Sequence, residues 1–189
     1  MWWPLSIDLA CFRWINQTLS NPACDLLMPL LSDPKLVLLP ALVAVPFLLW
    51  LGNARLRACL LFAIASVVLV ESLVVGPLKQ AIRRPRPAEF LPETRLLVGQ
   101  GKPRSMPSGH AANSFTVVTV FLWFYRRKAL LLLPVAGTIA FSRVYNGAHF
   151  PSDVLVGAIL GTAGAGLTIW SADRRSEEHT SELQSRQVI

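Results

Sequence analysis

Residues 142–153 read Ser-Arg-Val-Tyr-Asn-Gly-Ala-His-Phe-Pro-Ser-Asp, and they lie between two long apolar runs. The stretch contains a guanidinium (Arg143), an imidazole (His149) and a carboxylate (Asp153). An arginine or aspartate at the centre of a membrane helix costs about 2.5–3.5 kcal/mol on insertion scales, so ionisable groups in such places normally line a polar site. The stretch therefore predicts a functional site between two membrane-spanning helices.

The spacing within this stretch indicates how the site is prepared. His149 and Asp153 are four residues apart, and Pro151 suits the first turn of a helix that begins just after the histidine. A carboxylate on that turn reaches back to one imidazole nitrogen and leaves the other nitrogen free. This arrangement prepares a histidine as a nucleophile or a base.

The composition is that of an integral membrane protein. Of 189 residues, 53% are hydrophobic and 15% are charged, the mean hydropathy is +0.48, and the apolar residues form blocks. The net charge of +7 comes from basic residues at the ends of apolar runs, with no basic stripe and interleaved aromatics, so we expect no nucleic-acid partner. Lipid headgroups or a phosphorylated substrate explain the charge better. The three cysteines have no metal-ligand spacing, and a Cys11–Cys24 disulfide remains an open alternative.

Apolar runs and breaks predict an all-α, integral membrane helical bundle of about five spans. The expected spans are residues 36–51, 58–78, 108–125, 129–144 and 151–171. Residues 79–106 are too rich in proline and arginine to cross a bilayer and predict an extramembrane loop. Five spans place this loop and the turn at residues 145–150 on the same side of the membrane. The glycines of the last span favour close helix contact.

The two ends of the chain differ from this pattern. Residues 1–33 carry three tryptophans among polar residues, and we expect one or two amphipathic helices at the membrane interface. Residues 34–174 form the predicted membrane domain. Residues 175–189 are polar without an apolar period and resemble the translation of a sequencing adapter, so we expect a non-native or disordered tail. His179 is therefore excluded from any site.

Three polar clusters are predicted to face the same side. Lys79, Arg86 and Arg143 supply three cations, which suit a group with two or three anionic oxygens. Ser108 and Gly109 stand where the third span begins, and a helix N-terminus there presents free N–H groups and its positive end to an anion. His149, oriented by Asp153, is placed to attack phosphorus, and His110 is placed to protonate the departing oxygen. These opposite protonation states predict a bell-shaped pH profile.

The three clusters resemble the three-part pattern of the type 2 phosphatidic acid phosphatase superfamily, membrane lipid phosphatases related to vanadium haloperoxidases. Lysine, six residues, arginine and proline match residues 79–87, and proline-serine-glycine-histidine matches residues 107–110. Serine-arginine, five residues, histidine, three residues and aspartate match residues 142–153. Many members have six spans, whereas residues 1–33 here read as interfacial.

The resemblance implies the roles of the matched residues. His149 would form a phosphohistidine, Asp153 would be its partner and His110 the general acid, with no metal and no cofactor. The phosphoryl group would be held by Lys79, Arg86, Ser108, Gly109 and Arg143.

The resemblance also implies an activity, a class of substrate and a location in the membrane. The expected activity is removal of a terminal phosphate from a lipid phosphate or diphosphate, with undecaprenyl diphosphate favoured by the small size. Phosphatidylglycerophosphate, phosphatidate and lipid A 1-phosphate stay open. Lys and Arg are balanced between the two sides, so only the resemblance to bacterial members predicts a multi-pass inner-membrane protein whose site faces the periplasm. The sequence leaves the oligomeric state open.

Several alternatives compete with these interpretations. An anion transporter, a vanadate-binding haloperoxidase-like site and an inactive scaffold also use buried arginines or histidines. Glu71 pairs with a basic residue of the site or is a structural carboxylate. Asn146 and Gly147 suit a turn. A larger group of basic residues in and around the loop is interpreted as facing lipid headgroups: Arg83, Arg84, Arg95, Lys102 and Arg104.

Overall fold

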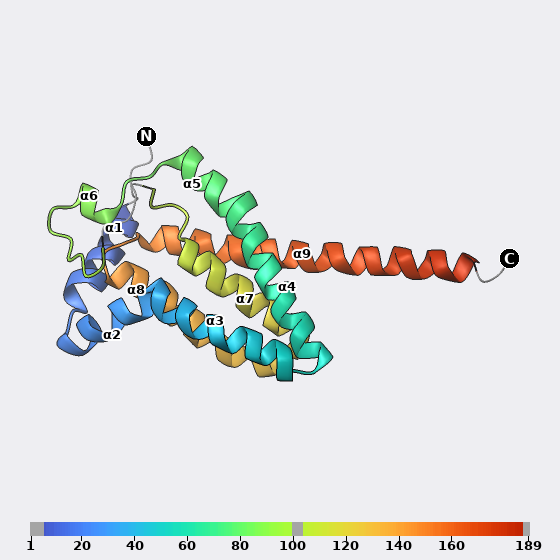
Figure 1. Cartoon of the computed structure of the whole chain (residues 1–189). Helices are drawn as coiled ribbons and strands as arrows, with labels where there is room; N and C mark the ends of the chain where they lie inside the picture. Colours follow the sequence, from blue (N-terminus) through green and yellow to red (C-terminus); the bar gives the residue numbers. More distant parts are fainter. Residues whose placement is uncertain (1–5, 100–103, 187–189) are drawn as a thin grey trace.

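The computed structural model describes residues 6–99 and 104–186, with side chains described as far as Arg175 except that of Val37. Within these residues all the regular secondary structure is helical (Figure 1), which confirms the predicted fold class. The elements are α1 (Ser6–Arg13), the π-helical turn η1 (Trp14–Thr18), α2 (Pro22–Ser32), α3 (Pro34–Leu51), α4 (Ala54–Val70), the π-helical turn η2 (Glu71–Val75), α5 (Gly76–Ile82), α6 (Pro87–Phe90), α7 (Gly109–Tyr125), the 3₁₀ helix η3 (Arg126–Leu131), α8 (Leu132–Tyr145) and α9 (Pro151–Arg186).

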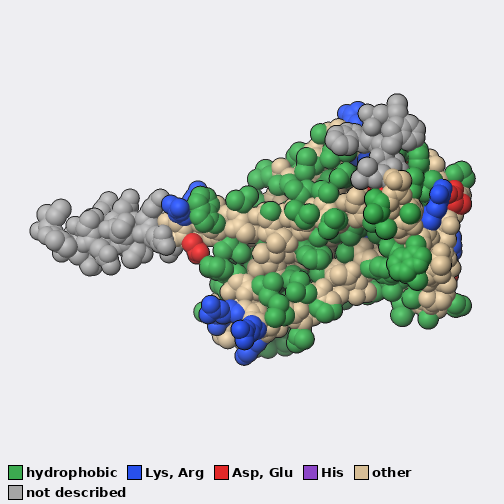
Figure 2. All heavy atoms as spheres, turned by 180° about the vertical axis from the view of Figure 1, so that it is seen from behind, with side chains coloured by type: hydrophobic (Ala, Val, Ile, Leu, Met, Phe, Trp, Pro, Cys, Tyr) green, Lys and Arg blue, Asp and Glu red, His purple; other side chains and the backbone are tan. Residues whose placement is uncertain are grey.

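The helices form a multi-pass membrane bundle. By length and composition, four helical stretches among the described residues are able to cross a bilayer: Pro34–Leu51, Ala54–Phe90, Gly109–Tyr145 and Pro151–Arg175. The third of these turns back at Arg126, whose φ is 51°, so that α7 and α8 are neighbouring helices and each of the five predicted spans is present as a helix. Figure 2 shows hydrophobic side chains over the middle of one face, with Lys and Arg toward its ends.

Short polar side chains set where several helices begin. Asn21 accepts a hydrogen bond from the backbone N–H of Cys24 at the start of α2. Asp33 accepts from Lys35 N at the start of α3, and Asn53 accepts from Leu56 N at the start of α4. Each side chain satisfies one of the N–H groups that a helix start leaves without an intrahelical partner. The breaks between α2, α3 and α4 are thereby fixed by residues that favour turns.

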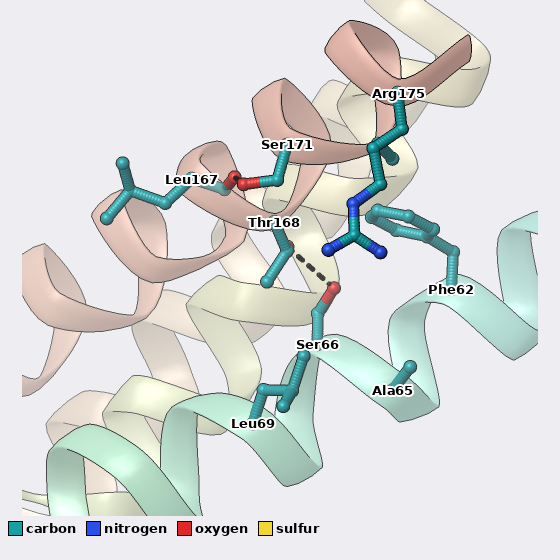
Figure 3. Close-up of a pocket in the computed structure, with 9 residues that line it drawn as sticks. Phe62, Ala65, Ser66, Leu69, Leu167, Thr168, Ser171 and Arg175 are labelled. Carbon is teal, nitrogen blue, oxygen red and sulfur yellow. Dashed lines mark hydrogen bonds between the residues drawn. The ribbon is translucent and has the colours of Figure 1, made fainter. Parts of the chain in front are cut away.

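The bundle is centred on the contact between α7 and α9. A Cβ added at Gly161 of α9 would lie 2.8 Å from the carbonyl carbon of Ala112 and 2.9 Å from its Cα, so only glycine permits this approach. At the same level Thr116 donates a hydrogen bond of 3.1 Å to the Gly161 carbonyl. On another side of α9, the hydroxyls of Ser66 of α4 and Thr168 share a hydrogen bond of 3.0 Å, and both residues line a pocket of about 380 Å³ (Figure 3). These contacts are the small-residue and polar packing that membrane helices use.

The N-terminal helices cover one end of the bundle (Figure 1). Phe12 of α1 packs on Phe150 with ring centroids 5.5 Å apart. The Asn16 amide donates to the carbonyls of Tyr145 and Arg95, and its oxygen accepts from the Arg95 backbone N–H. The segment is thus attached both to the loop after α6 and to the turn after α8. Its predicted place at the membrane interface stays a prediction, and residues 1–5 lie outside the described residues.

The last helix is longer than the sequence predicts, and the cysteines are not paired. Helix α9 continues to Arg186 beyond the predicted domain end, residues 187–189 lie outside the described residues, and a non-native origin of the tail stays a prediction. All three cysteines are free, so the Cys11–Cys24 disulfide does not form. Cys11 is exposed on α1, whereas Cys24 is half-buried in the first turn of α2.

Candidate active site

The turn between α8 and α9 fixes the position of His149. Gly147 has a φ of +75°, and a Cβ there would lie 2.6 Å from the Arg95 carbonyl oxygen, so a side chain is excluded by both conformation and space. Asn146 donates to the Met28 carbonyl and to Ser32 Oγ. The backbone N–H of His149 donates to the Arg143 carbonyl at 3.2 Å. The imidazole is therefore attached to a rigid, buried turn and is itself only 2% exposed.

The two ring nitrogens of His149 face different groups. Nδ1 is 3.7 Å from Asp153 Oδ2 and 3.4 Å from Ser105 Oγ, whereas Nε2 is 3.4 Å from Nη1 of Arg86. The predicted pairing thus brings the histidine and the carboxylate within 3.7 Å of each other, a little beyond hydrogen-bond distance, with a serine hydroxyl beside them. Burial lowers the pKa of His149 to about 4, although the nearby Asp153 carboxylate opposes this shift. The imidazole is therefore neutral at neutral pH, as a nucleophile requires.

Asp153 is completely buried and all its oxygens are engaged. Oδ1 accepts a hydrogen bond of 2.6 Å from Nη1 of Arg84, and Oδ2 accepts from the Phe150 backbone N–H at 2.9 Å and from the Ser105 hydroxyl. Because a buried carboxylate without partners costs several kcal/mol, these donors are needed to keep it in place. Asp153 lies in the first turn of α9, where the helix dipole also favours negative charge.

Two of these partners were missed in the sequence. The interpretation of Arg84 as facing lipid headgroups is wrong, because the residue is 5% exposed and bonds to Asp153 and Asp8. Its one sequence signal is alternation with Arg86 in the run Arg-Pro-Arg-Pro. Ser105 had no signal beyond its place shortly before the Pro-Ser-Gly-His motif. Of the other residues in that group, Arg95 pairs with Asp25 at 2.6 Å and Lys102 lies outside the described residues.

The three predicted cations come together around this turn. Nη1 of Arg86 donates to the Ala148 carbonyl at 2.8 Å, and Nη1 of Arg143 donates to the Ser32 carbonyl at 3.2 Å. Nζ of Lys79 is 3.8 Å from Oε1 of Glu71, so the glutamate pairs with a site residue, one of its two predicted roles. The charges of Arg86 and Arg143 both act on Lys79. Cations from α5, α8 and the stretch before α6 thus share one region.

The start of α7 faces the same region. A Cβ at Gly109 would lie 3.0 Å from Nζ of Lys79, so glycine allows the lysine to approach the helix N-terminus. The Ser108 backbone N–H donates to the Asp153 carbonyl at 2.9 Å, which joins the second and third motifs directly. Within the described residues, the buried atoms Ser108 Oγ and Arg143 Nε have no hydrogen-bond partner. These donors, together with the helix N-terminus, suit an anion.

His110, on the first turn of α7, completes the set. Its ring lies close enough to Arg143, Lys79 and His149 to interact electrostatically with each of them, so the two imidazoles belong to one site. His110 also lines a cavity of about 520 Å³ with mainly apolar walls. The wall residues that carry this character come from α2, α3, α4, α7 and α8: Leu31, Leu38, Val67, Val117, Leu132 and Ile139. The site therefore has a cationic side at Arg86 and Arg143 and an apolar side beyond His110.

The polar groups of this site are mainly cationic. In residues 6–99 and 104–175, no three His, Cys, Asp or Glu side chains are grouped as metal ligands. All eight predicted site residues are described, and every one lies at the end of the bundle formed by the starts of α7 and α9 and the end of α8. A model of the PAP2 superfamily matches residues 56–177, which contain all of them. The chain belongs to the PAP2 superfamily.

Named relatives agree with this membership. The chain is 29% identical over 171 residues to the putative undecaprenyl-diphosphatase YbjG of Escherichia coli, covering 88% of this chain and 84% of the relative. It is 29% identical over 133 residues to the bacitracin transport permease protein BcrC of Bacillus licheniformis, covering 69% of this chain and 64% of that relative. The crystal structure of Aquifex aeolicus LpxE has a TM-score of 0.68 and 31% identity, covering 87% of this chain and 96% of that one. The PAP2 relatives of the present chain include lipid phosphatases, which are hydrolases of phosphate esters.

Proposed function

We propose that this PAP2 protein removes a terminal phosphate from a lipid phosphate or diphosphate through a phosphohistidine on His149. The observation that carries the proposal is the surroundings of Nε2. Arg86 lies against this nitrogen, and the buried Ser108 Oγ and Arg143 Nε lack partners among the described residues. A tetrahedral dianion would satisfy these donors, whereas unpaired buried donors otherwise cost about 1–3 kcal/mol each.

The first chemical step is attack by Nε2 of His149 on phosphorus. A P–N bond forms while the bond from phosphorus to the lipid-side oxygen breaks, and His110 gives its proton to that oxygen. Lys79, Arg86, Arg143, the Ser108 hydroxyl and the N–H groups at the start of α7 hold the three non-bridging oxygens, and Gly109 allows them to come close. Asp153, through Nδ1, stabilises the positive charge that the phosphohistidine ring acquires.

The second step releases phosphate. His110, now neutral, takes a proton from water, the water oxygen attacks phosphorus, and the P–N bond breaks to regenerate neutral His149. His110 has then regained its proton, His149 is free again and the phosphoryl group has left as phosphate, with no redox change. The proposed chemistry uses side chains alone, with no metal and no cofactor. The apolar cavity beside His110 is on the side where the lipid must leave.

Undecaprenyl diphosphate is the proposed substrate. The name of the Escherichia coli relative and the coverage of both chains support it. Phosphatidylglycerophosphate, phosphatidate and lipid A 1-phosphate are the alternatives, because the three motifs contact phosphate and not the lipid chain. We place the protein in the inner membrane with the site toward the periplasm. Arg55, Arg57 and the cluster of residues 126–128 would then be cytoplasmic.

The test is phosphate release by protein purified in detergent with EDTA present. Undecaprenyl diphosphate, phosphatidylglycerophosphate and phosphatidate are offered in parallel, and the His149→Ala variant is the control. Release by the wild type and none by the variant is the expected result. Release from none of the lipids refutes the proposed activity, release abolished by EDTA refutes the metal-free mechanism, and unchanged release by His149→Ala removes the nucleophile and favours an anion transporter.

A further inference from the structure

A buried ion cluster joins the N-terminal helix α1 to the proposed active site. Asp8 of α1 and Arg84 of the stretch after α5 are each 5% exposed, although they are 76 residues apart in sequence. Nη2 of Arg84 donates to Asp8 Oδ2 at 2.6 Å, while Nη1 donates to Asp153 Oδ1 at 2.6 Å. Asp8 lies outside the residues 56–177 that match the superfamily model, so none of the three motifs includes it.

The cluster forms hydrogen bonds with the first turn of α9. Asp8 Oδ1 accepts from the Ser152 backbone N–H at 2.9 Å, and Oδ2 accepts from the Ser152 hydroxyl at 2.6 Å. This is the role of a helix cap, supplied here by a residue 144 positions away. Arg84 also donates to Ser152 Oγ and lies over the Phe150 ring, 4.4 Å from its centroid. The turn that carries His149 and the helix start that carries Asp153 are therefore held by the same two side chains.

Charge explains why the cluster matters for chemistry. Asp153 is completely buried and its histidine partner is neutral, so the carboxylate needs a separate cation, which Arg84 supplies. Arg84 in turn needs an anion on its other nitrogen, which Asp8 provides. We propose that Asp8 and Arg84 are positioning residues that keep Asp153 charged and aligned with His149, which makes α1 a support of the active site. This inference rests on the proposed phosphatase function.

The test compares four single variants by kcat and KM on the lipid that the wild type hydrolyses. Asp8→Asn keeps the shape and removes the charge, Arg84→Lys keeps the charge but cannot reach both carboxylates, and Arg84→Ala removes the group. Glu93→Gln is the matched control. Glu93 forms an ion pair of 2.9 Å with Arg13, which lies on α1 like Asp8, but both side chains of this pair are about half exposed. We expect kcat to fall about tenfold in Asp8→Asn and about 100-fold in Arg84→Ala, with Arg84→Lys between them, as for other groups that orient a catalytic side chain.

The pattern of the losses separates positioning from structure. KM should stay within about twofold. Asp8→Asn should add little to Arg84→Ala in the double variant, because the charge that Asp8→Asn removes acts on Asp153 through Arg84. Should Arg84→Ala fail to fold, Asp8→Asn against Glu93→Gln decides the matter. Equal kcat in these two variants, or a rise in KM with kcat unchanged, overturns the inference. A wild type that is inactive on every lipid refutes the proposed function instead, so the two failures are distinguishable.

Discussion

Gly157 is the position where packing and the proposed chemistry are most directly coupled. It lies on α9 against the first turn of α7, and a Cβ there would overlap the Ser108 carbonyl oxygen and lie 3.2 Å from the Ala111 Cβ. The neighbouring hydrogen bond from Ser108 N to the Asp153 carbonyl is 2.9 Å long. The Gly157→Ala substitution must therefore push the start of α7 away from α9 and stretch this bond.

The size of the effect follows from the contact. Overpacking of this kind costs about 1–3 kcal/mol, and the better helix propensity of alanine offsets up to about 1 kcal/mol of it. A shift approaching 1 Å at Ser108 would lower kcat about 100-fold, since misplacement on that scale has this effect on catalytic geometry. The assays are thermal unfolding in detergent and phosphate release. Gly166→Ala on the same helix is the control, because nothing lies within 4 Å of the added Cβ.

The control variant should unfold at an equal or higher temperature than the wild type and keep its kcat. Gly157→Ala should unfold at a lower temperature than Gly166→Ala and lose most activity. If both variants have the same unfolding temperature and the same kcat, then the close approach of α7 and α9 does not set the geometry of the phosphate site, and the reasoning is refuted.

Two more predictions concern the site itself. Burial lowers the pKa of His149 to about 4, so its neutral, nucleophilic form persists well below pH 6. In a pH profile of kcat/KM, the acidic limb should therefore lie near pH 4. An acidic limb near pH 6.5 would show that burial does not lower the pKa of this histidine. Arg86→Lys should lower kcat/KM about 10- to 100-fold, because one ammonium cannot bond the Ala148 carbonyl and still reach the phosphoryl group beside Nε2 of His149. Steady-state rates on the preferred lipid measure it, and a rate equal to that of the wild type would show that Arg86 does not contact phosphate.

The sequence predicts the membrane helical bundle because membrane-spanning helices require long runs of apolar residues. The pairing of His149 with Asp153 was readable too, because helical spacing brings residues four apart onto one face. Asp8 and Arg84 were not readable, since a charged residue in a polar segment looks the same whether it faces headgroups or a buried carboxylate. The contact of Asp8 with Ser152 spans 144 residues, and no local pattern encodes it. The sequence accordingly predicts helices in residues 1–33, but it does not indicate their contacts with the start of α9.

In the proposed mechanism, His149 attacks a phosphoryl group held by three motifs that lie far apart in the sequence. The most direct test is to mix purified protein with undecaprenyl diphosphate carrying ³²P in its terminal phosphate, quench in alkali, and map the labelled peptide. Label on His149 in the wild type, and no label in His149→Ala, is the predicted result. Steady turnover without any label on residue 149, or label on a different side chain, would contradict the account.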